Sequence, residues 1–155
     1  MKRFAFLLSL VATLFLLSSC TKYSFKSIEE KVVGTWTFEK VKNKPGILKS
    51  NIDITKNYNN WEYTFEAGGG VVAFNTATKE TELGRWHLEE YVDVYYDDDG
   101  TSTSTSEYVL RFYLRAGRGA EQNYIWNVGV VTAKRLRASE RFGNETYTYV
   151  LARKN

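Results

Sequence analysis

Few side chains in this chain are of a type and spacing that could perform a reaction. The one histidine, His87, could serve as a general base or a metal ligand, but a single histidine on a strand is more typical of a surface residue. Glu89 and Glu90 are adjacent, so on a strand they point to opposite faces and cannot form the carboxylate pair of a glycoside hydrolase. Residues 97–100 read Asp-Asp-Asp-Gly, but they lack the acid at position 1 and the glutamate at position 12 that the calcium loop of an EF-hand requires. We therefore expect a protein that is not an enzyme and that holds no metal or cofactor.

The amino-acid composition excludes further kinds of functional site. The 155 residues include one Cys, one His and one Pro, and 43% of them are hydrophobic and 15% aromatic. A single Cys excludes an internal disulfide framework and any cysteine-based zinc or iron–sulfur site. The aromatic content argues against bulk disorder, and the length fits one domain. These numbers favour a small, aromatic-rich module.

The N-terminus carries the pattern of an export signal. Two basic residues precede an apolar run over residues 4–17, which is shorter than the roughly 20 residues needed to span a bilayer. Residues 17–20 then read Leu-Ser-Ser-Cys, which resembles the lipobox of bacterial lipoproteins. The resemblance implies that Cys20 receives a lipid through its thiol and that the chain is cleaved before it. We expect a lipoprotein signal peptide over residues 1–19.

The residues after Cys20 indicate a location. By analogy with the sorting rule of enteric bacteria, Thr21 favours the outer membrane over the inner one, and Lys22 and Lys26 stand where some lipoproteins carry an acidic surface-export stretch. We expect an envelope protein held in the outer membrane by its N-terminal lipid, facing the periplasm. The cleaved chain has 19 basic and 18 acidic residues, a net charge of +1, so nucleic acid is not an expected partner. A protein partner is not identified by the sequence.

Beyond a tether over residues 20–32, alternation of apolar and polar residues predicts strands in a domain over residues 33–155. Trp61, Tyr63 and Phe65, for example, share one strand face. The predicted strands cover residues 34–39, 61–66, 71–76, 83–96, 108–115, 124–131, 136–140 and 146–153, of which 83–96 could be one bent strand or two.

Three segments depart from this alternation. Residues 42–59 are polar and predict a long loop with a short edge strand around Ile52 and Ile54. Residues 101–106 are Ser and Thr in alternation and predict a polar linker. Within the tether, Ser27 is placed to cap one helical turn.

Sequential strands without an amphipathic helix of 12 residues exclude parallel βαβ units. We expect an all-β fold: an antiparallel up-and-down β-barrel of about eight to ten strands, because closure removes the sheet edges. A β-sandwich is the alternative.

Two Gly-x-Trp motifs, Gly34 to Trp36 and Gly84 to Trp86, make the chain resemble the lipocalin-like lipoproteins of Bacteroidetes. The resemblance covers residues 33–153 and rests on the order of the lipobox, the two motifs, an aromatic hairpin and a closing hairpin. It implies a lipocalin-like barrel that binds small molecules, with Trp36 plugging the closed end. It also implies an arginine stacked on that tryptophan, for which Arg135, Arg137 and Arg153 are the candidates.

The aromatic residues at alternating positions are the candidate lining of a ligand site, because rings with polar tips suit a small apolar or amphipathic molecule. These candidates are Trp61, Tyr63, Phe65, Tyr108, Phe112, Tyr124, Trp126, Tyr147 and Tyr149. The alternative is a barrel filled by these rings, which would serve as a structural or protein-interaction accessory of an envelope complex. An enzyme acting on lipid or glycan would need titratable groups gathered in one pocket.

Overall fold

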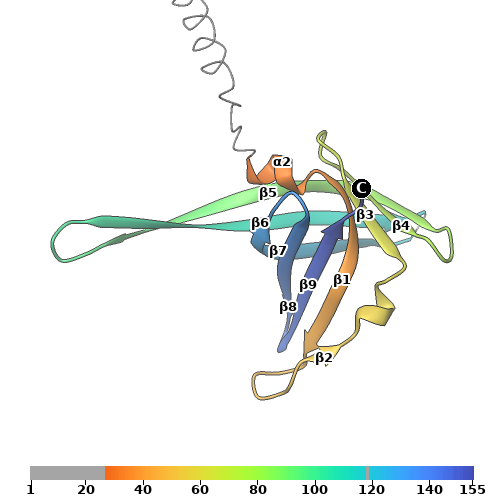
Figure 1. Ribbon diagram of the computed structural model, residues 1–155, viewed down its shortest axis with the longest axis horizontal. Helices are drawn as coiled ribbons and strands as arrows, with labels where there is room; N and C mark the ends of the chain where they lie inside the picture. The colour runs from red at the N-terminus through yellow and green to blue at the C-terminus, as the bar shows by residue number, and fades with distance from the viewer. Residues whose placement is uncertain (1–26, 118) are drawn as a thin grey trace, which may run out of the picture.

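The computed structural model describes residues 27–117 and 119–155, so Cys20, the expected signal peptide and the first part of the tether lie outside the described residues. Within these ranges the secondary structure is almost entirely β (Figure 1). The elements are α2 (Ile28–Val32), β1 (Gly34–Lys44), β2 (Ile52–Asp53), the 3-10 turn η1 (Thr55–Asn57), β3 (Trp61–Phe65), β4 (Gly70–Asn75), β5 (Thr81–Tyr96), β6 (Ser102–Ala116), β7 (Glu121–Val131), β8 (Arg135–Phe142) and β9 (Glu145–Arg153).

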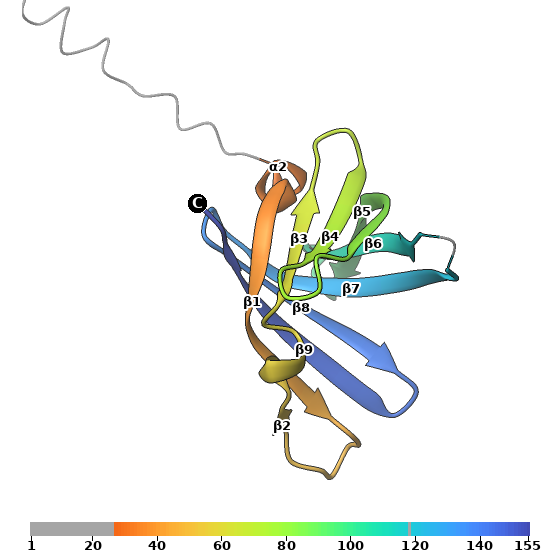
Figure 2. The same cartoon turned by 90° about the vertical axis from the view of Figure 1, so that its right-hand side faces the viewer.

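The strands form one antiparallel sheet that closes on itself. β1 pairs with β3, and each strand from β3 onward pairs with the next one in sequence as far as β9. β9 then pairs with the free edge of β1, from Trp36 opposite Arg153 to Lys44 opposite Thr146. The result is a closed eight-stranded up-and-down barrel, with the short β2 as an additional strand on β1 (Figure 2). The expected barrel is confirmed, and the β-sandwich is excluded.

Helix α2 covers one end of the barrel, which we call the closed end (Figure 2). Ser27 and Glu30 form a capping box at its start, as the Ser27 position indicates. Val32 is fully buried, and its carbonyl accepts a hydrogen bond of 2.7 Å from Nε1 of Trp36. The last part of the expected tether is therefore a helix packed on the barrel.

Arg153 is the arginine that stacks on Trp36, with its guanidinium carbon 4.3 Å from the indole centroid. Its N–H groups also donate hydrogen bonds to the main-chain carbonyls of Lys31, Val33 and Ala133. The side chain crosses directly over Gly34, where a Cβ atom would lie 2.0 Å from Nη1. Gly34, the glycine of the first Gly-x-Trp motif, thus leaves space for Arg153, which stacks on the tryptophan of the same motif.

The second Gly-x-Trp motif also marks a close approach. A Cβ atom on Gly84 would lie 1.6 Å from the main-chain oxygen of Tyr113 on β6. Trp86 is buried, and its Nε1 donates a 2.9 Å hydrogen bond to the carbonyl of Glu66 at the end of β3. This glycine lets β5 and β6 pass closely enough for Trp86 to reach the β3–β4 turn.

Aromatic rings fill the centre of the barrel. Phe65 lies edge-on to both Trp86 and Phe112, with ring centroids 5.6 Å apart in each pair. Phe112 in turn lies edge-on to Trp126 at 4.9 Å and stacks on Tyr124 at 4.7 Å. Because these rings are in mutual contact, the centre is a packed core.

Strands β5 and β6 extend well beyond the barrel as a two-stranded hairpin (Figure 1). Their pairing runs without a break from Glu82 opposite Ala116 to Tyr96 opposite Ser102. The segment 83–96 is therefore one strand, and the linker expected over residues 101–106 is wrong, because these residues pair with the end of β5. We call residues 91–107 the hairpin arm.

The long loop expected over residues 42–59 is also shorter than predicted. β1 continues to Lys44, and β2 pairs with it through Ile52 and Asp53. Thr55 in turn η1 accepts a hydrogen bond from Val41 N at 2.9 Å, which holds the turn against β1. Residues 55–58 therefore form part of the barrel wall.

Candidate ligand-binding site at the barrel mouth

A pocket of about 300 Å³ opens at the barrel end opposite α2, and we call it the mouth pocket. Its floor is the aromatic core, and its walls come from β1, η1, β3, β5, β7 and β9. The lining residues are Phe38, Asn57, Tyr58, Trp61, Tyr63, Glu82, Gln122, Tyr124, Trp126 and Tyr149.

The mouth is open because β7 and β8 part there. Their pairing reaches only from Val131 opposite Leu136 to Asn127 opposite Ser139. Beyond that point the buried side chain of Glu140 takes the place of the ladder, and its Oε1 accepts a hydrogen bond from Ile125 N at 3.1 Å. One carboxylate thus satisfies a main-chain donor that a paired strand would otherwise satisfy.

Glu140 also connects this gap to the pocket wall. Its Oε2 accepts a 3.1 Å hydrogen bond from the hydroxyl of Tyr149. Burial raises the pKa of Glu140, although the hydrogen bonds from Ile125 and Tyr149 lower it in part. Burial and the nearby Glu140 charge together raise the pKa of Tyr149. The pair is therefore held as a neutral phenol that donates to the carboxyl group.

Two further groups shape the chemistry of the mouth pocket. Burial raises the pKa of the half-buried Glu82, with a smaller contribution from Glu80. Burial, with smaller contributions from Glu82 and Glu140, raises the pKa of Tyr124 to about 12. Burial is the main cause of both shifts, so the pocket presents rings, hydroxyl groups and a carboxyl group in a poorly solvated space.

The indole of Trp126 provides an additional donor at the pocket floor. Its Nε1 is buried and makes no hydrogen bond of good geometry among the described residues, but it lies close enough to the Glu140 carboxyl to help lower the pKa of that group. The indole plane stacks on Tyr149 with centroids 4.8 Å apart. A buried donor with poor hydrogen-bond geometry gains from a better-placed acceptor, which a bound molecule could supply.

Replacement of Glu140 by glutamine is expected to change how stability depends on pH. Because the pKa is higher in the folded than in the unfolded chain, the ionised carboxylate disfavours folding, and this effect disappears as the pH falls below the unfolded value near 4.5. In thermal unfolding, Glu140→Gln should melt above the wild type at pH 8, and the difference should shrink towards pH 4. Glu140→Ala is the control, since it leaves Ile125 N without an acceptor and should melt lower at every pH. Parallel profiles for wild type and Glu140→Gln would contradict the expectation.

The structure brings five of the nine predicted lining residues to the mouth pocket: Trp61, Tyr63, Tyr124, Trp126 and Tyr149. The other four lie elsewhere. Phe65 and Phe112 belong to the filled centre. Tyr147 stacks on Tyr149 but lies outside the lining, and Tyr108 lies near α2, towards the closed end.

Sequence reasoning missed half of the lining. Tyr58 lies in the segment that was predicted to be a loop, yet its ring meets Phe38 at 5.2 Å. Glu82 and Gln122 lie at strand starts, where polar residues are typical of turns. The aromatic side chain of Tyr58 within an otherwise polar stretch could have indicated a packed residue, because a large ring is usually buried against other side chains.

His87 and Glu89, which the sequence offered as candidates for catalysis, lie on the outer surface of the barrel wall. The hydroxyl of Tyr91 and the side chains of Arg111 and His87 hydrogen-bond Glu89 and lower its pKa to about 2. Glu90 points to the opposite face, as adjacent strand residues must. Within residues 27–117 and 119–155, no three His, Cys, Asp or Glu side chains gather as a metal site.

The fold and the mouth pocket define a small antiparallel β-barrel with a filled centre and one aromatic pocket at its open end. Comparison with known proteins finds no match to this chain among protein-family models, curated proteins or solved structures. Among the described residues, no helix combines the length and hydropathy that crossing a bilayer requires.

Proposed function

We propose that this chain is a lipocalin-like, membrane-anchored binding protein whose mouth pocket holds a small amphipathic ligand. The mouth pocket carries the proposal, because Trp61 and Tyr124 offer ring faces and Glu82 offers a carboxyl acceptor beside them. Aromatic faces bind a flat apolar body, and a few placed polar groups orient its head. The proposal is one of binding rather than catalysis, which the position of His87 outside the pocket supports.

The dimensions and charge of the pocket restrict the ligand. A volume of about 300 Å³ is at the small end for ligand sites, so a ring system fits better than a long acyl chain. Glu82 lines the pocket and Glu140 lies behind Tyr149, and neither forms a salt bridge in the described part of the chain. A ligand with a hydrogen-bond-donating or cationic head is therefore favoured over one with an anionic head.

A matched pair of probes tests the proposal. We expect 1-naphthylmethylamine to bind more tightly than 1-naphthoate in isothermal titration calorimetry, because the two share a ring and differ in the sign of the head group. Its addition should shift the indole N–H signals of Trp61 and Trp126 in heteronuclear NMR, while those of Trp36 and Trp86 towards the closed end should stay in place. Absence of binding by either probe, or shifts confined to Trp36 and Trp86, would contradict the proposal.

Two variants distinguish ligand binding in the mouth pocket from binding elsewhere on the protein surface. Trp61→Ala removes one half-buried ring of the lining and should weaken 1-naphthylmethylamine binding about two- to tenfold, since an aromatic contact contributes about 0.5–1.5 kcal/mol. Phe142→Ala removes an exposed ring that does not line the pocket and should leave the affinity unchanged.

The lipid anchor is the second part of the proposal, and it rests on the lipobox around Cys20. Two or more acyl chains would hold the protein on a membrane, whereas one chain binds only marginally. In a bacterial host grown with labelled palmitate, the wild type should acquire label and Cys20→Ala should not. Label retained by the variant would refute the anchor.

A role as a protein-interaction accessory is the second candidate function. The observation that favours it is the hairpin arm, which exposes large apolar side chains outside the barrel.

A further inference from the structure

The hairpin arm is built like a surface that is covered in an assembly. Val92, Val94 and Tyr96 alternate along one face of β5 and are 55%, 49% and 76% exposed. β4 pairs with β5 only up to Arg85, and β7 pairs with β6 only from Tyr108, so both edges of the arm are open. An isolated two-stranded hairpin is only marginally stable in water, and open edges invite pairing.

All charged side chains of the hairpin arm are acidic. Residues 91–107 contain five acidic side chains and no Lys or Arg, which gives a net charge of −5. The acidic residues are Asp93, Asp97, Asp98, Asp99 and Glu107. None of them forms a salt bridge within the described residues.

The same chain carries a surface of opposite charge on strands β8, β9 and β1. Side chains of residues directly opposite in a sheet share a face, so Lys40, Val150 and Arg137 form one row across the three strands. Lys44, Thr146 and Arg141 form a second row, and Lys42 lies between the rows. We call these five cationic residues the basic face: Lys40, Lys42, Lys44, Arg137 and Arg141. In the described part of the chain, none of the five has an acidic group within salt-bridge distance, although Asp53 on β2 lies opposite Lys42 and the charges of Lys40 and Lys42 help to lower its pKa.

The basic face has uncharged side chains at its centre as well as cationic ones at its borders. Its central strand presents uncharged, mostly β-branched side chains, including Thr146, Thr148 and Val150, between the two cationic strands. On the arm, Asp93 and Glu107 lie on the face opposite Val92, Val94 and Tyr96, and Asp97, Asp98 and Asp99 lie at the tip. The arm therefore offers an apolar strip that ends in an acidic tip to a β-branched strand flanked by cationic side chains. The arm extends away from the body, so it does not cover the basic face of its own chain (Figure 1).

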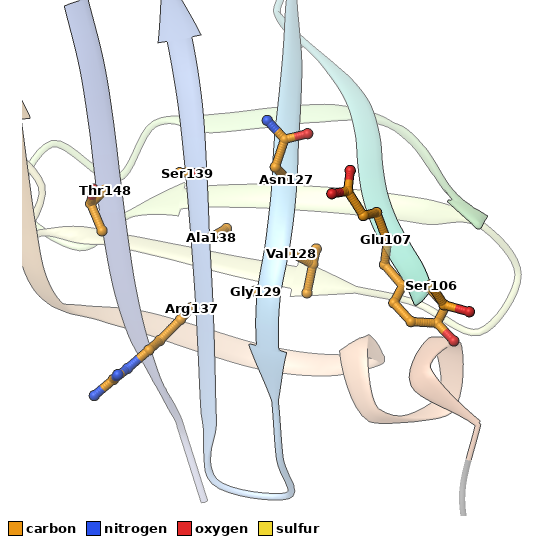
Figure 3. A pocket seen from close by; sticks show the side chains of 10 residues that line it. Ser106, Glu107, Asn127, Val128, Gly129, Arg137, Ala138, Ser139 and Thr148 are labelled. Atoms are coloured by element: carbon orange, nitrogen blue, oxygen red, sulfur yellow. The ribbon is translucent and has the colours of Figure 1, made fainter. Parts of the chain in front are cut away.

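An open groove of about 610 Å³ joins the two surfaces. It begins at Ser106 and Glu107, at the root of the arm, crosses Asn127 and Gly129 on β7, and ends at Arg137 and Thr148. These residues lie on the neighbouring strands β6, β7, β8 and β9, as can be followed in Figure 3. A chain segment lying in the groove would contact an acidic and a basic border at once.

From these observations we infer that the hairpin arm of one copy of this chain docks on the basic face of a second copy. The inference does not depend on the mouth pocket or on a ligand. Complementary unpaired charges orient the two surfaces, and burial of Val92, Val94 and Tyr96 supplies the apolar contact. Because surface charges are screened by salt, association should weaken as ionic strength rises.

Zero-length cross-linking tests the inference on the full chain. An equimolar mixture of unlabelled and ¹⁵N-labelled protein at low salt is treated with a carbodiimide, which joins carboxylates to amines that touch. Mass spectrometry should find mixed-isotope links between the peptide holding residues 97–99 and the peptides holding Lys40, Lys42 or Lys44. Only links within one copy, or none from the arm, would overturn the inference.

Charge reversal gives an independent readout by analytical ultracentrifugation. Lys40→Glu/Lys42→Glu/Lys44→Glu should lower the association constant about tenfold or more. Combining it with Asp97→Lys/Asp98→Lys/Asp99→Lys should restore association, which a misfolded variant could not do. The matched control, Lys49→Glu/Lys56→Glu/Lys79→Glu, changes exposed lysines outside the basic face and should lower the constant much less. A monomer at low salt, or an equal loss of association in both lysine triple variants, would overturn the inference. The arm would then be a surface for binding a different protein.

Discussion

Gly84→Ala is expected to destabilise the protein by about 3 kcal/mol or more, because among the glycines of the described residues this one would give a new Cβ its closest contact. The new Cβ would lie 1.6 Å from the carbonyl oxygen of Tyr113 and 2.7 Å from its carbonyl carbon. Both atoms belong to the main chain of β6, so no side-chain rotation relieves the contact. β5 and β6 would have to separate at the point where Trp86 enters the core.

Chemical unfolding followed by tryptophan fluorescence measures this effect, and Gly129→Ala is the control. Gly129 also lies within a strand, but its nearest contact for a new Cβ is the carbonyl oxygen of Arg137 at 4.0 Å. Alanine there should be neutral or slightly stabilising, because it reduces the entropy of the unfolded chain. Two variants of equal stability would show that β5 and β6 do not approach as closely as the structure has them.

Arg153→Met is expected to lower the free energy of unfolding by about 2–4 kcal/mol, because methionine keeps the aliphatic length and removes the guanidinium. That group stacks on Trp36 and donates to three carbonyls, from the end of α2, the start of β1 and the turn before β8. Its loss leaves these carbonyls without their donors and uncovers the indole. Faster hydrogen exchange at Nε1 of Trp36 should accompany the change.

Arg135→Met is the matched control, since Arg135 was an equal candidate for the stacking position. Arg135 forms a two-point ion pair with Glu39, but both side chains are about half exposed. Exposed ion pairs contribute about 0–1 kcal/mol, so this variant should unfold close to the wild type. If both methionine variants lose the same stability, Arg153 does not close the barrel end as described.

The elements that were predictable from the sequence are those with a local signal. Trp61, Tyr63 and Phe65 alternate with polar residues, and the structure places them along the inner side of β3. Ser27 and Glu30 stand three residues apart, which is the spacing of a capping box, and the helix begins there. Such signals need only the period of one element, so neighbours in space do not alter them.

Neither the hairpin arm nor the mouth pocket could be predicted from local sequence patterns. Residues 101–106 have no apolar alternation, and only the register with β5 makes them a strand. The mouth pocket depends on where Glu140 interrupts the pairing of β7 with β8, and on Tyr58 folding back onto Phe38. Each of these is a contact between residues far apart in the chain or between strands that are not yet aligned.

By itself, the sequence of this protein determined which side of each strand faces inward and that the strands follow one another in a single sheet, because alternation and turn residues act over a few positions. Only the tertiary structure decided how the inward rings share one limited volume. They fill the centre, leave space at one end and send the β5–β6 hairpin outside, because packing is set by all strands together.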